Sequence, residues 1–289
     1  MIPAAFEYHR PSTIQDAVAL LGRLGDEAKV LAGGQSLIPL MKLRLASPRH
    51  VVDLNRISGL GAIAEQDGTL VIGALVRESE LEASELVRHR LPILADACRV
   101  IADPLVRNLA TVGGNLAHGD PANDHPAVML ALGAEVVAIG PQGSRRIPVA
   151  EFFTGPLETA LRAGEILTEI HVPLPPPRSG GVYLKLERKV GDFATAAVGV
   201  QITLAGGDAC TQAGIGLTNV GPTPIKARRA EALLKGRRLD DAAIREAAEA
   251  AAGESDPAED LRGSVAYKRD LVRVLTARAL RRALERAAH

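Results

Sequence analysis

The sequence predicts an α+β protein, built from a small parallel unit, a larger mixed region and a third region in which strands precede helices. Three observations lead to this class. Some segments repeat apolar residues at helical spacing and others alternate them with polar residues. A proline-rich stretch separates the second region from the third. Beyond it the strand-like segments come first and the helical ones follow, an order typical of α+β proteins.

The first region, residues 1–57, has the pattern of a compact strand–helix–strand unit. A helix is expected over 12–27, with Ser12 or Thr13 as its N-cap and Gly25 as its end. A short buried strand (28–34), a helical segment (35–46) and a second strand (48–57) follow. So short a succession of elements predicts a small parallel sheet.

The second region, residues 58–175, mixes strands with helices. Its expected strands and helices are strand 69–76, helices 79–89, 91–102 and 125–133, and strands 134–140, 145–153 and 165–174. The stretch "VPLPPPRSGG" (172–181) marks its end, because prolines and glycines continue neither a helix nor a central strand.

The third region, residues 178–289, has strand-like and then helical segments. The strands are expected at 181–190, 195–205 and 210–220, with a turn at 206–208, and the helices at 224–236, 240–253 and 266–288. The last helix carries a row of arginines, which indicates either a solvated face or a contact with another subunit.

Composition excludes several kinds of function. The chain has 34 basic and 34 acidic residues, so it has no net field to attract nucleic acid. No apolar run approaches the roughly 18 residues of a membrane span and no signal peptide is evident, so we expect a cytoplasmic protein. Cys98 and Cys210 are far apart in apolar segments and are expected to be buried thiols. Two cysteines cannot bind a four-thiolate iron–sulfur cluster.

Two glycine pairs are the strongest functional signal. Gly33-Gly34 precedes Gln35 and Ser36, and "TVGGN" at 111–115 repeats the pattern, each between an apolar run and a helical segment. Such a pair is either a simple turn or a loop whose N–H groups bind phosphate. Two of them suit a ligand with two linked phosphates. The sequence has neither GxGxxG nor GxxxxGK[ST], so a dinucleotide here points to FAD in a non-Rossmann architecture.

The segments "LAGGQSLIPLMKLRLASPRHVVDLNRI", "ATVGGNLAHGDPANDHPAVMLALGAEV" and "YLKLERKVGDFATAAVGV" resemble the FAD-binding medium subunits of molybdenum hydroxylases. That family includes carbon monoxide dehydrogenase medium chains and the FAD domains of xanthine dehydrogenases. The resemblance implies an FAD-binding domain of the PCMH/vanillyl-alcohol-oxidase type in two parts, 1–57 and 58–175. It also implies a C-terminal domain of antiparallel strands and helices, 178–289, of the CO dehydrogenase flavoprotein type.

The resemblance also implies which residues contact FAD. They are the first pyrophosphate loop (Ala32, Gly33, Gly34, Gln35, Ser36 and Leu37), the second loop (Thr111, Gly113, Gly114 and Asn115), and Ile101, Asp124, Ile166, Leu167, Lys185 and Phe193. Three of them have ordinary structural alternatives. Asp124 is otherwise a helix N-cap, Lys185 part of a solvated strand face, and Phe193 a core residue.

The resemblance implies an electron-transfer function. A small subunit with two-iron two-sulfur clusters delivers electrons, and a terminal acceptor (quinone, NAD or dioxygen) receives them. Substrate chemistry then belongs to a large subunit with the molybdenum cofactor. No nucleophile–base pair is recognisable, so we expect no catalytic residue. His118 and His125 lie beside Asp120 and Asp124, but no further motif supports a metal site. The rival interpretations are a free-standing FAD-dependent reductase or oxidase, and a module that no longer binds FAD.

Overall fold

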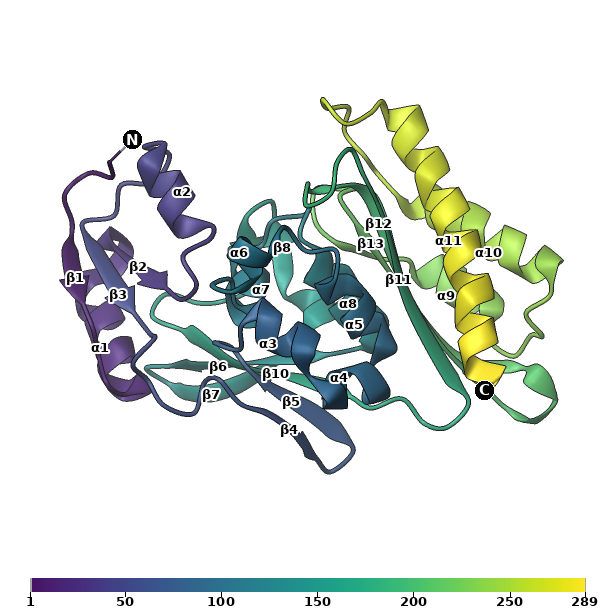
Figure 1. The fold of residues 1–289 in the computed structure, drawn as a ribbon, viewed down its shortest axis with the longest axis horizontal. Helices are drawn as coiled ribbons and strands as arrows, with labels where there is room; N and C mark the ends of the chain where they lie inside the picture. Colours follow the sequence, from purple (N-terminus) through teal and green to yellow (C-terminus); the bar gives the residue numbers. More distant parts are fainter. Residues whose placement is uncertain (1, 289) are drawn as a thin grey trace.

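The computed structural model describes residues 2–288, and these form three main sheets in succession along the long axis of the molecule (Figure 1). The N-terminal region lies at one end and the C-terminal region at the other. A two-stranded ribbon, β8 (Phe153–Gly155) with β9 (Glu158–Thr159), completes the strands of the middle region. The α+β class is confirmed.

The N-terminal region contains the predicted parallel unit and one further strand, β1, that the sequence analysis does not predict. It comprises β1 (Glu7–His9), α1 (Ile14–Leu24), β2 (Ala28–Leu31), α2 (Leu37–Lys42) and β3 (His50–Asp53), with parallel strands in the order β1-β3-β2. Thr13 is the N-cap of α1, because its Oγ1 accepts a hydrogen bond from the backbone N–H of Asp16 at 3.1 Å. The helix ends at Gly25, which has a φ of 56°.

The middle region is an antiparallel sheet in the order β4-β5-β10-β6-β7 with helices over one face (Figure 1). Its strands are β4 (Ile63–Gln66), β5 (Thr69–Gly73), β6 (Glu135–Gly140), β7 (Gly143–Pro148) and β10 (Ile166–Pro173). Its helices are α3 (Glu78–Ala83), α4 (Glu85–Arg90), α5 (Pro92–Cys98), α6 (Pro104–Arg107), α7 (Val112–His118) and α8 (Asp124–Leu132).

Two local predictions for this region are wrong. The helix expected over 79–89 is interrupted at Ser84, which ends α3 and caps α4 by accepting from the N–H of Val87 at 3.3 Å. The second glycine pair does not lie in a turn ahead of a helix but inside the first turn of α7. The reason is that Thr111 is the N-cap of α7, with its Oγ1 accepting from the N–H of Gly114 at 3.2 Å.

The C-terminal region is an antiparallel sheet, β11 (Ser179–Glu187), β12 (Ala194–Leu204), β13 (Cys210–Thr218) and β14 (Ile225–Lys226), in that order. The helices α9 (Arg228–Leu234), α10 (Asp241–Glu254) and α11 (Val265–Ala288) follow and cover one face. Helices α5 and α8 of the middle region pack against the other face. A 3-10 turn at Gly206–Asp208 connects β12 to β13, as predicted.

Helix α8 packs unusually close to the C-terminal sheet. A Cβ on Gly214 or Gly216 of β13 would lie 1.9 Å from the carbonyl oxygen of Ala131 or Ala127 of α8. All nine residues of α8 are buried, as expected for a helix that packs on every side. The two glycines therefore let this helix lie directly on the strand backbone.

The two thiols are buried, as predicted, and both are free. Among the helices of residues 2–288, none is long and apolar enough to cross a membrane.

Candidate flavin site

The two glycine-containing segments lie against each other in the structure. A Cβ on Gly33 would be 2.1 Å from the carbonyl oxygen of Leu109 and 2.8 Å from the Cα of Ala110. The corresponding Cβ position of Gly114 is 3.8 Å from the Cβ of Ala32. About eighty residues separate the two segments in the sequence. In the fold their backbones are so close at Gly33 that no side chain fits there.

The first segment presents unused hydrogen-bond donors. Within residues 2–288, the backbone N–H groups of residues 33–37 donate to no protein acceptor. Gly34 has a φ of 76°, a left-handed conformation that favours glycine. Helix α2 behind this loop has only six residues, so the N–H groups themselves, more than a helix dipole, form the possible anion site.

The second segment uses its donors differently. The N–H groups of Val112 and Gly113 donate to the carbonyls of Val76 and Ala74, both at 3.0 Å, and that of Gly114 donates to Thr111 Oγ1. Gly113 is required for packing, because a Cβ there would lie 2.5 Å from the Cβ of Ala74. These three N–H groups are therefore unavailable to a ligand, contrary to the idea that both glycine pairs offer free backbone donors.

A polar atom of the second segment does lack a partner. The Oδ1 of Asn115 is buried and accepts no hydrogen bond from residues 2–288. Buried polar groups without a partner are rare in native proteins. The backbone carbonyl of Asn115 accepts from Asn123 Nδ2 at 2.8 Å, which ties this segment to the start of α8.

Asp124 and Lys185 form a buried ion pair next to this segment. Lys185 Nζ donates to Asp124 Oδ2 at 3.1 Å and to the carbonyl of Val100 at 2.8 Å, and Tyr183 OH donates to Asp124 Oδ1 at 2.5 Å. The Lys185 side chain is 2% exposed, so the alternative of a solvated strand face is wrong. The N-cap alternative for Asp124 is also wrong, since Asn123 occupies the cap and Asp124 is the first residue of α8.

Burial governs the electrostatics of this group. Burial raises the pKa of Asp124, although Lys185 and the hydroxyl of Tyr183 oppose the rise. Burial also raises the pKa of Tyr183, and the carboxylate of Asp124 adds to that rise. Tyr183 was not among the predicted residues. The period of two in β11, which puts residues 183 and 185 on one face, is the signal that points to it.

The remaining predicted residues extend this arrangement. Ile101 is buried and follows Val100, the residue whose carbonyl accepts from Lys185. Gly191 approaches the same segment, since a Cβ there would be 2.9 Å from the carbonyl oxygen of Ala102. Phe193 is 47% exposed, with the guanidinium of Arg262 5.8 Å from its ring centre, so core packing is the wrong alternative for it.

Ile166 and Leu167 open β10 and are both buried. Ile166 belongs to the apolar cluster of the N-terminal region, the cluster against which Ala32 of the first glycine segment packs. Leu167 belongs to the larger core of the middle region.

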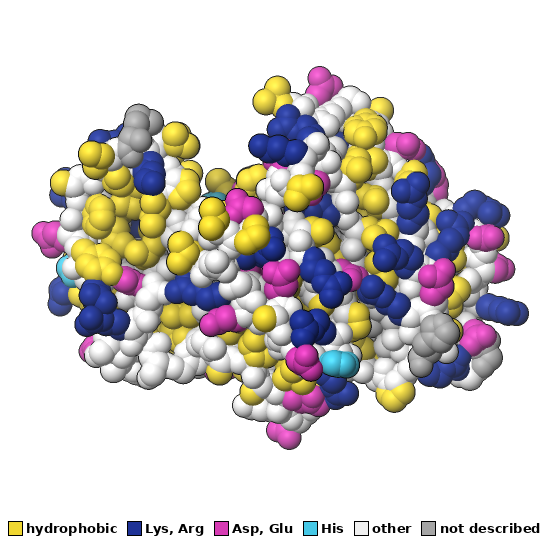
Figure 2. Space-filling model, in the orientation of Figure 1, with side chains coloured by type: hydrophobic (Ala, Val, Ile, Leu, Met, Phe, Trp, Pro, Cys, Tyr) yellow, Lys and Arg dark blue, Asp and Glu magenta, His cyan; other side chains and the backbone are white. Residues whose placement is uncertain are grey.

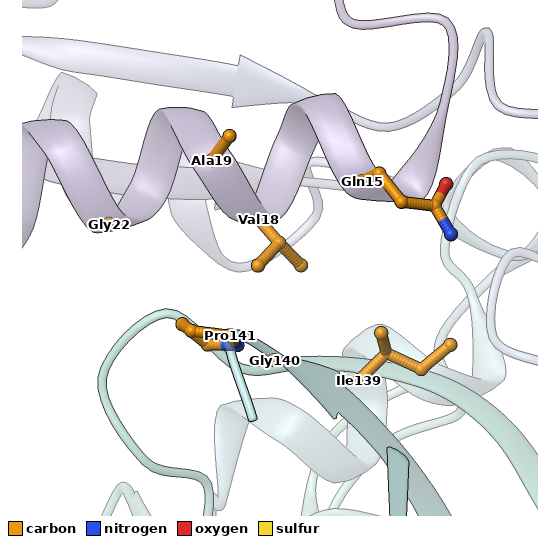
Figure 3. A pocket seen from close by; sticks show the side chains of 7 residues that line it. All are labelled: Gln15, Val18, Ala19, Gly22, Ile139, Gly140 and Pro141. Atoms are coloured by element: carbon orange, nitrogen blue, oxygen red, sulfur yellow. The ribbon is translucent and has the colours of Figure 1, made fainter. Parts of the chain in front are cut away.

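The space-filling view shows a hollow between the N-terminal region and the rest of the molecule, with yellow apolar side chains along its edges (Figure 2). Exposed apolar residues of the segments described above include Ile38, Leu105, Leu109 and Phe193. A separate pocket of about 410 Å³ lies between α1 and the end of β6 (Figure 3). It is lined by Gln15, Val18, Ala19, Gly22, Ile139, Gly140 and Pro141, contains no predicted site residue and no titratable group, and so is not the candidate site.

Comparison with known proteins supports the flavin interpretation. Residues 4–175 match the family "FAD binding domain in molybdopterin dehydrogenase" and residues 181–283 match "CO dehydrogenase flavoprotein C-terminal domain". The carbon monoxide dehydrogenase medium chains of Afipia carboxidovorans and Hydrogenophaga pseudoflava are both 46% identical. The alignment with the Afipia protein covers 99% of both chains, and the alignment with the Hydrogenophaga protein covers 100% of both chains.

Solved structures agree with the sequence matches. A chain of carbon monoxide dehydrogenase from Hydrogenophaga pseudoflava superposes with a TM-score of 0.97 at 48% identity, covering 99% of both chains. A chain of quinoline 2-oxidoreductase from Pseudomonas putida 86 gives 0.93 at 31% identity, covering all of both chains. The chain therefore belongs to the family of FAD-binding medium subunits of molybdenum hydroxylases, with an FAD-binding domain followed by the C-terminal domain of CO dehydrogenase flavoproteins.

Proposed function

We propose that this chain is the FAD-binding, electron-transfer subunit of a molybdenum hydroxylase complex. Its partners are a large subunit with the molybdenum cofactor and a small subunit with two-iron two-sulfur clusters. The relatives named carbon monoxide dehydrogenase medium chain support this assignment. Bound FAD supplies the redox chemistry, taking electrons from the clusters and passing them to a terminal acceptor. We place the complex in the cytoplasm.

The observation that carries the proposal is the meeting of the two glycine segments. The free N–H groups of residues 33–37 suit the diphosphate of FAD, because charge-assisted hydrogen bonds to phosphate are strong. The close approach at Gly33 puts these donors beside Leu109 and Ala110, which lead into the second glycine segment, and Gly114 of that segment lies close to Ala32. The unpartnered Oδ1 of Asn115 then suits a donor group of the ligand.

The other predicted residues have distinct roles in this proposal. Lys185 and Asp124 hold a fixed ion pair whose geometry Tyr183 and the Val100 carbonyl complete. Ile101 and Phe193 supply apolar surface beside the ligand. Ile166 or Leu167 contacts it through the backbone, since both side chains lie in buried apolar clusters. Phe193 is the exposed aromatic among them and suits stacking with a flat ring system.

We assign no catalytic residue to the chain. Asp124 accepts hydrogen bonds from both Tyr183 and Lys185, and all three side chains are buried, which suits positioning better than proton transfer. The rival candidate is a free-standing FAD-dependent reductase or oxidase, which needs an acid or base free to reach a substrate. We also propose domain boundaries at 1–57, 58–175 and 178–289.

The test is to express the chain together with the proteins encoded by adjoining genes, purify it, and analyse the bound flavin. Heat denaturation is expected to release FAD, and two further subunits are expected to co-purify. Release of FMN, or colour that stays with the polypeptide, would contradict the cofactor assignment. Bleaching of the flavin by a hydroxylation substrate in the isolated chain would favour the free-standing enzyme.

A further inference from the structure

Two histidines and a glutamate gather on one face of the N-terminal sheet, away from the glycine segments. Strands β1 and β3 are parallel neighbours, and Glu7 is paired with His50 in their register. Because side chains alternate along a strand, Glu7 and His9 project from the same face of β1 and Tyr8 from the other. This register brings Glu7, His9 and His50 together.

The three side chains form a triangle of metal-ligand dimensions. His9 Nε2 and His50 Nδ1 are 3.1 Å apart, and Glu7 Oε2 is 3.4 Å from His50 Nδ1 and 3.9 Å from His9 Nε2. A tetrahedral zinc ion with bonds of about 2.0–2.1 Å holds its ligand atoms about 3.3 Å from each other. The triangle accepts such an ion if the three separations change by at most about 0.6 Å, the largest change being between Glu7 Oε2 and His9 Nε2. Side-chain rotation of the exposed Glu7 supplies this change.

Access and donor chemistry fit the same ion. The side chains of His9 and His50 are 23% and 15% exposed and that of Glu7 is 74% exposed, so a hydrated ion reaches the triangle from solvent. Two imidazoles with one carboxylate form a donor set that binds zinc in preference to magnesium or calcium, because imidazole nitrogen suits transition metals. Three protein ligands leave a fourth position for water.

A second cluster, Glu78 with Cys98 and His125, does not offer this combination. Its three residues are fully buried, and Glu78 Oε2 and His125 Nε2 are already bonded to each other at 2.6 Å. A hydrated cation has no route from solvent to such a position. The surface triangle is therefore the stronger candidate.

We propose that Glu7, His9 and His50 bind a divalent transition-metal ion, zinc foremost, and that this ion fastens β1 to β3. Strand β1 is an edge strand of three residues, held to β3 by backbone pairing and by the bond from Tyr8 OH to Asp53. A metal bound only by the folded arrangement stabilises it in proportion to its affinity and concentration. The site is separate from the flavin site, so its failure leaves the proposed function untouched.

The test is titration calorimetry of zinc chloride into the full chain, without a histidine tag, at about pH 7.5. One site per chain with a Kd tighter than about 50 µM is expected. The variants His9→Gln, His50→Gln and Glu7→Gln each remove one ligand and should each weaken binding at least about tenfold. Zinc in hundredfold excess over Kd should raise the Tm of the parent chain by about 2 °C or more.

The matched control is His89→Gln on α4, an exposed histidine whose Nδ1 is bonded to the carbonyl of Glu85. This variant should keep the parent affinity. Binding weaker than the stated Kd, or equal affinity in the parent chain and in His50→Gln, overturns the proposal. Glu7→Gln distinguishes loss of a metal ligand from misfolding. Glu7 is exposed, so this variant should keep the metal-free Tm of the parent chain and lose only metal affinity.

Discussion

Arg77 donates a hydrogen bond from Nη2 to Asn55 Oδ1 across 2.5 Å and so adds a side-chain link between two segments of the flavin site that are distant in the sequence. Asn55 donates from Nδ2 to the carbonyl of Ala32 at 2.8 Å, and Arg77 Nη1 donates to the carbonyl of Leu109. The bonds thus run from the residue before the first glycine pair to the segment before the second. Arg77 and Asn55 therefore fix the spacing of the two segments before any ligand arrives.

Replacing Arg77 with methionine should loosen this spacing without unfolding the chain. The change removes the bridge, while the backbone N–H of Arg77 keeps its bond to Glu80. We expect FAD affinity to fall at least about tenfold, or about 1.4 kcal/mol. Fluorescence titration of FAD into the flavin-free chain measures it. The control is Arg90→Met, whose exposed pair with Glu65 contributes little. Equal affinity in both variants would show that the bridge is irrelevant to binding.

Replacing Gly33 with alanine should remove most of the bound flavin. The new Cβ would lie 2.1 Å from the carbonyl of Leu109, so the two segments must separate. We expect the affinity for FAD to fall at least about a hundredfold, which corresponds to roughly 2.8 kcal/mol. We also expect a lower Tm. Gly206→Ala, in the turn between β12 and β13, has open space around its Cβ and should change neither quantity. Flavin-to-protein ratio and thermal melting are the measurements, and full occupancy in Gly33→Ala would refute the expectation.

Breaking the Asp124–Lys185 pair should destabilise the fold strongly. Lys185→Met leaves a buried carboxylate without its cation, a change that typically costs about 3–5 kcal/mol. The double variant Asp124→Asn with Lys185→Met should lose less than the sum of the single changes, with a coupling of at least about 1 kcal/mol. Urea unfolding gives the four free energies. Strict additivity would mean that the two side chains do not support each other.

The buried pair of Glu78 and His125 should make stability depend on pH. Burial alone lowers the pKa of His125, but the charge and hydrogen bond of Glu78 raise it above the ordinary 6.5 in the net. The folded chain therefore holds the proton more tightly than the unfolded chain. This contribution to stability is complete below pH 6.5 and is lost as pH rises through the folded-state pKa.

The matched variant is Glu78→Gln with His125→Met, which removes both charges at similar volume. Glu78 Oε1 and His125 Nδ1 have no hydrogen-bond partner in residues 2–288, so the pair is incompletely compensated. The double variant should unfold with a smaller pH dependence between about pH 6.5 and 9 and be at least as stable at the upper end. Urea unfolding over that range is the measurement; an unchanged slope would assign the dependence to other groups.

Local sequence rules located most elements because their signals are local. Thr13 and Gly25 mark the ends of α1 through a side-chain cap and a left-handed residue, both recognisable from residue type. The same rule applies at Thr111, whose capping hydroxyl starts α7 before the second glycine pair, where a loop is expected from the glycines alone. A threonine three residues before Gly114 is the signal that identifies this helix start.

The tertiary part of the site had no such signal. Arg77 and Asn55 follow strand ends as ordinary polar residues, and their bridge exists only once two distant segments are adjacent. The burial of Lys185 likewise depends on Asp124 at the start of α8 and on the Val100 carbonyl after α5, contacts that periodicity along a single strand does not show. Residue types and spacing thus indicated the ligand-facing segments, while the contacts that hold them required the fold.

The close contact of α8 with Gly214 and Gly216 limits how this family can be recombined. The two family matches meet near residue 180, which suggests two domains that could be exchanged separately. Helix α8, however, belongs to the FAD-binding domain and lies on the backbone of the C-terminal domain. A C-terminal domain with side chains at positions 214 and 216 would push α8, and Asp124 at its start, away from Lys185. Functional chimaeras must therefore exchange α8 together with β13, and residues 1–175 produced alone would expose an apolar helix to water.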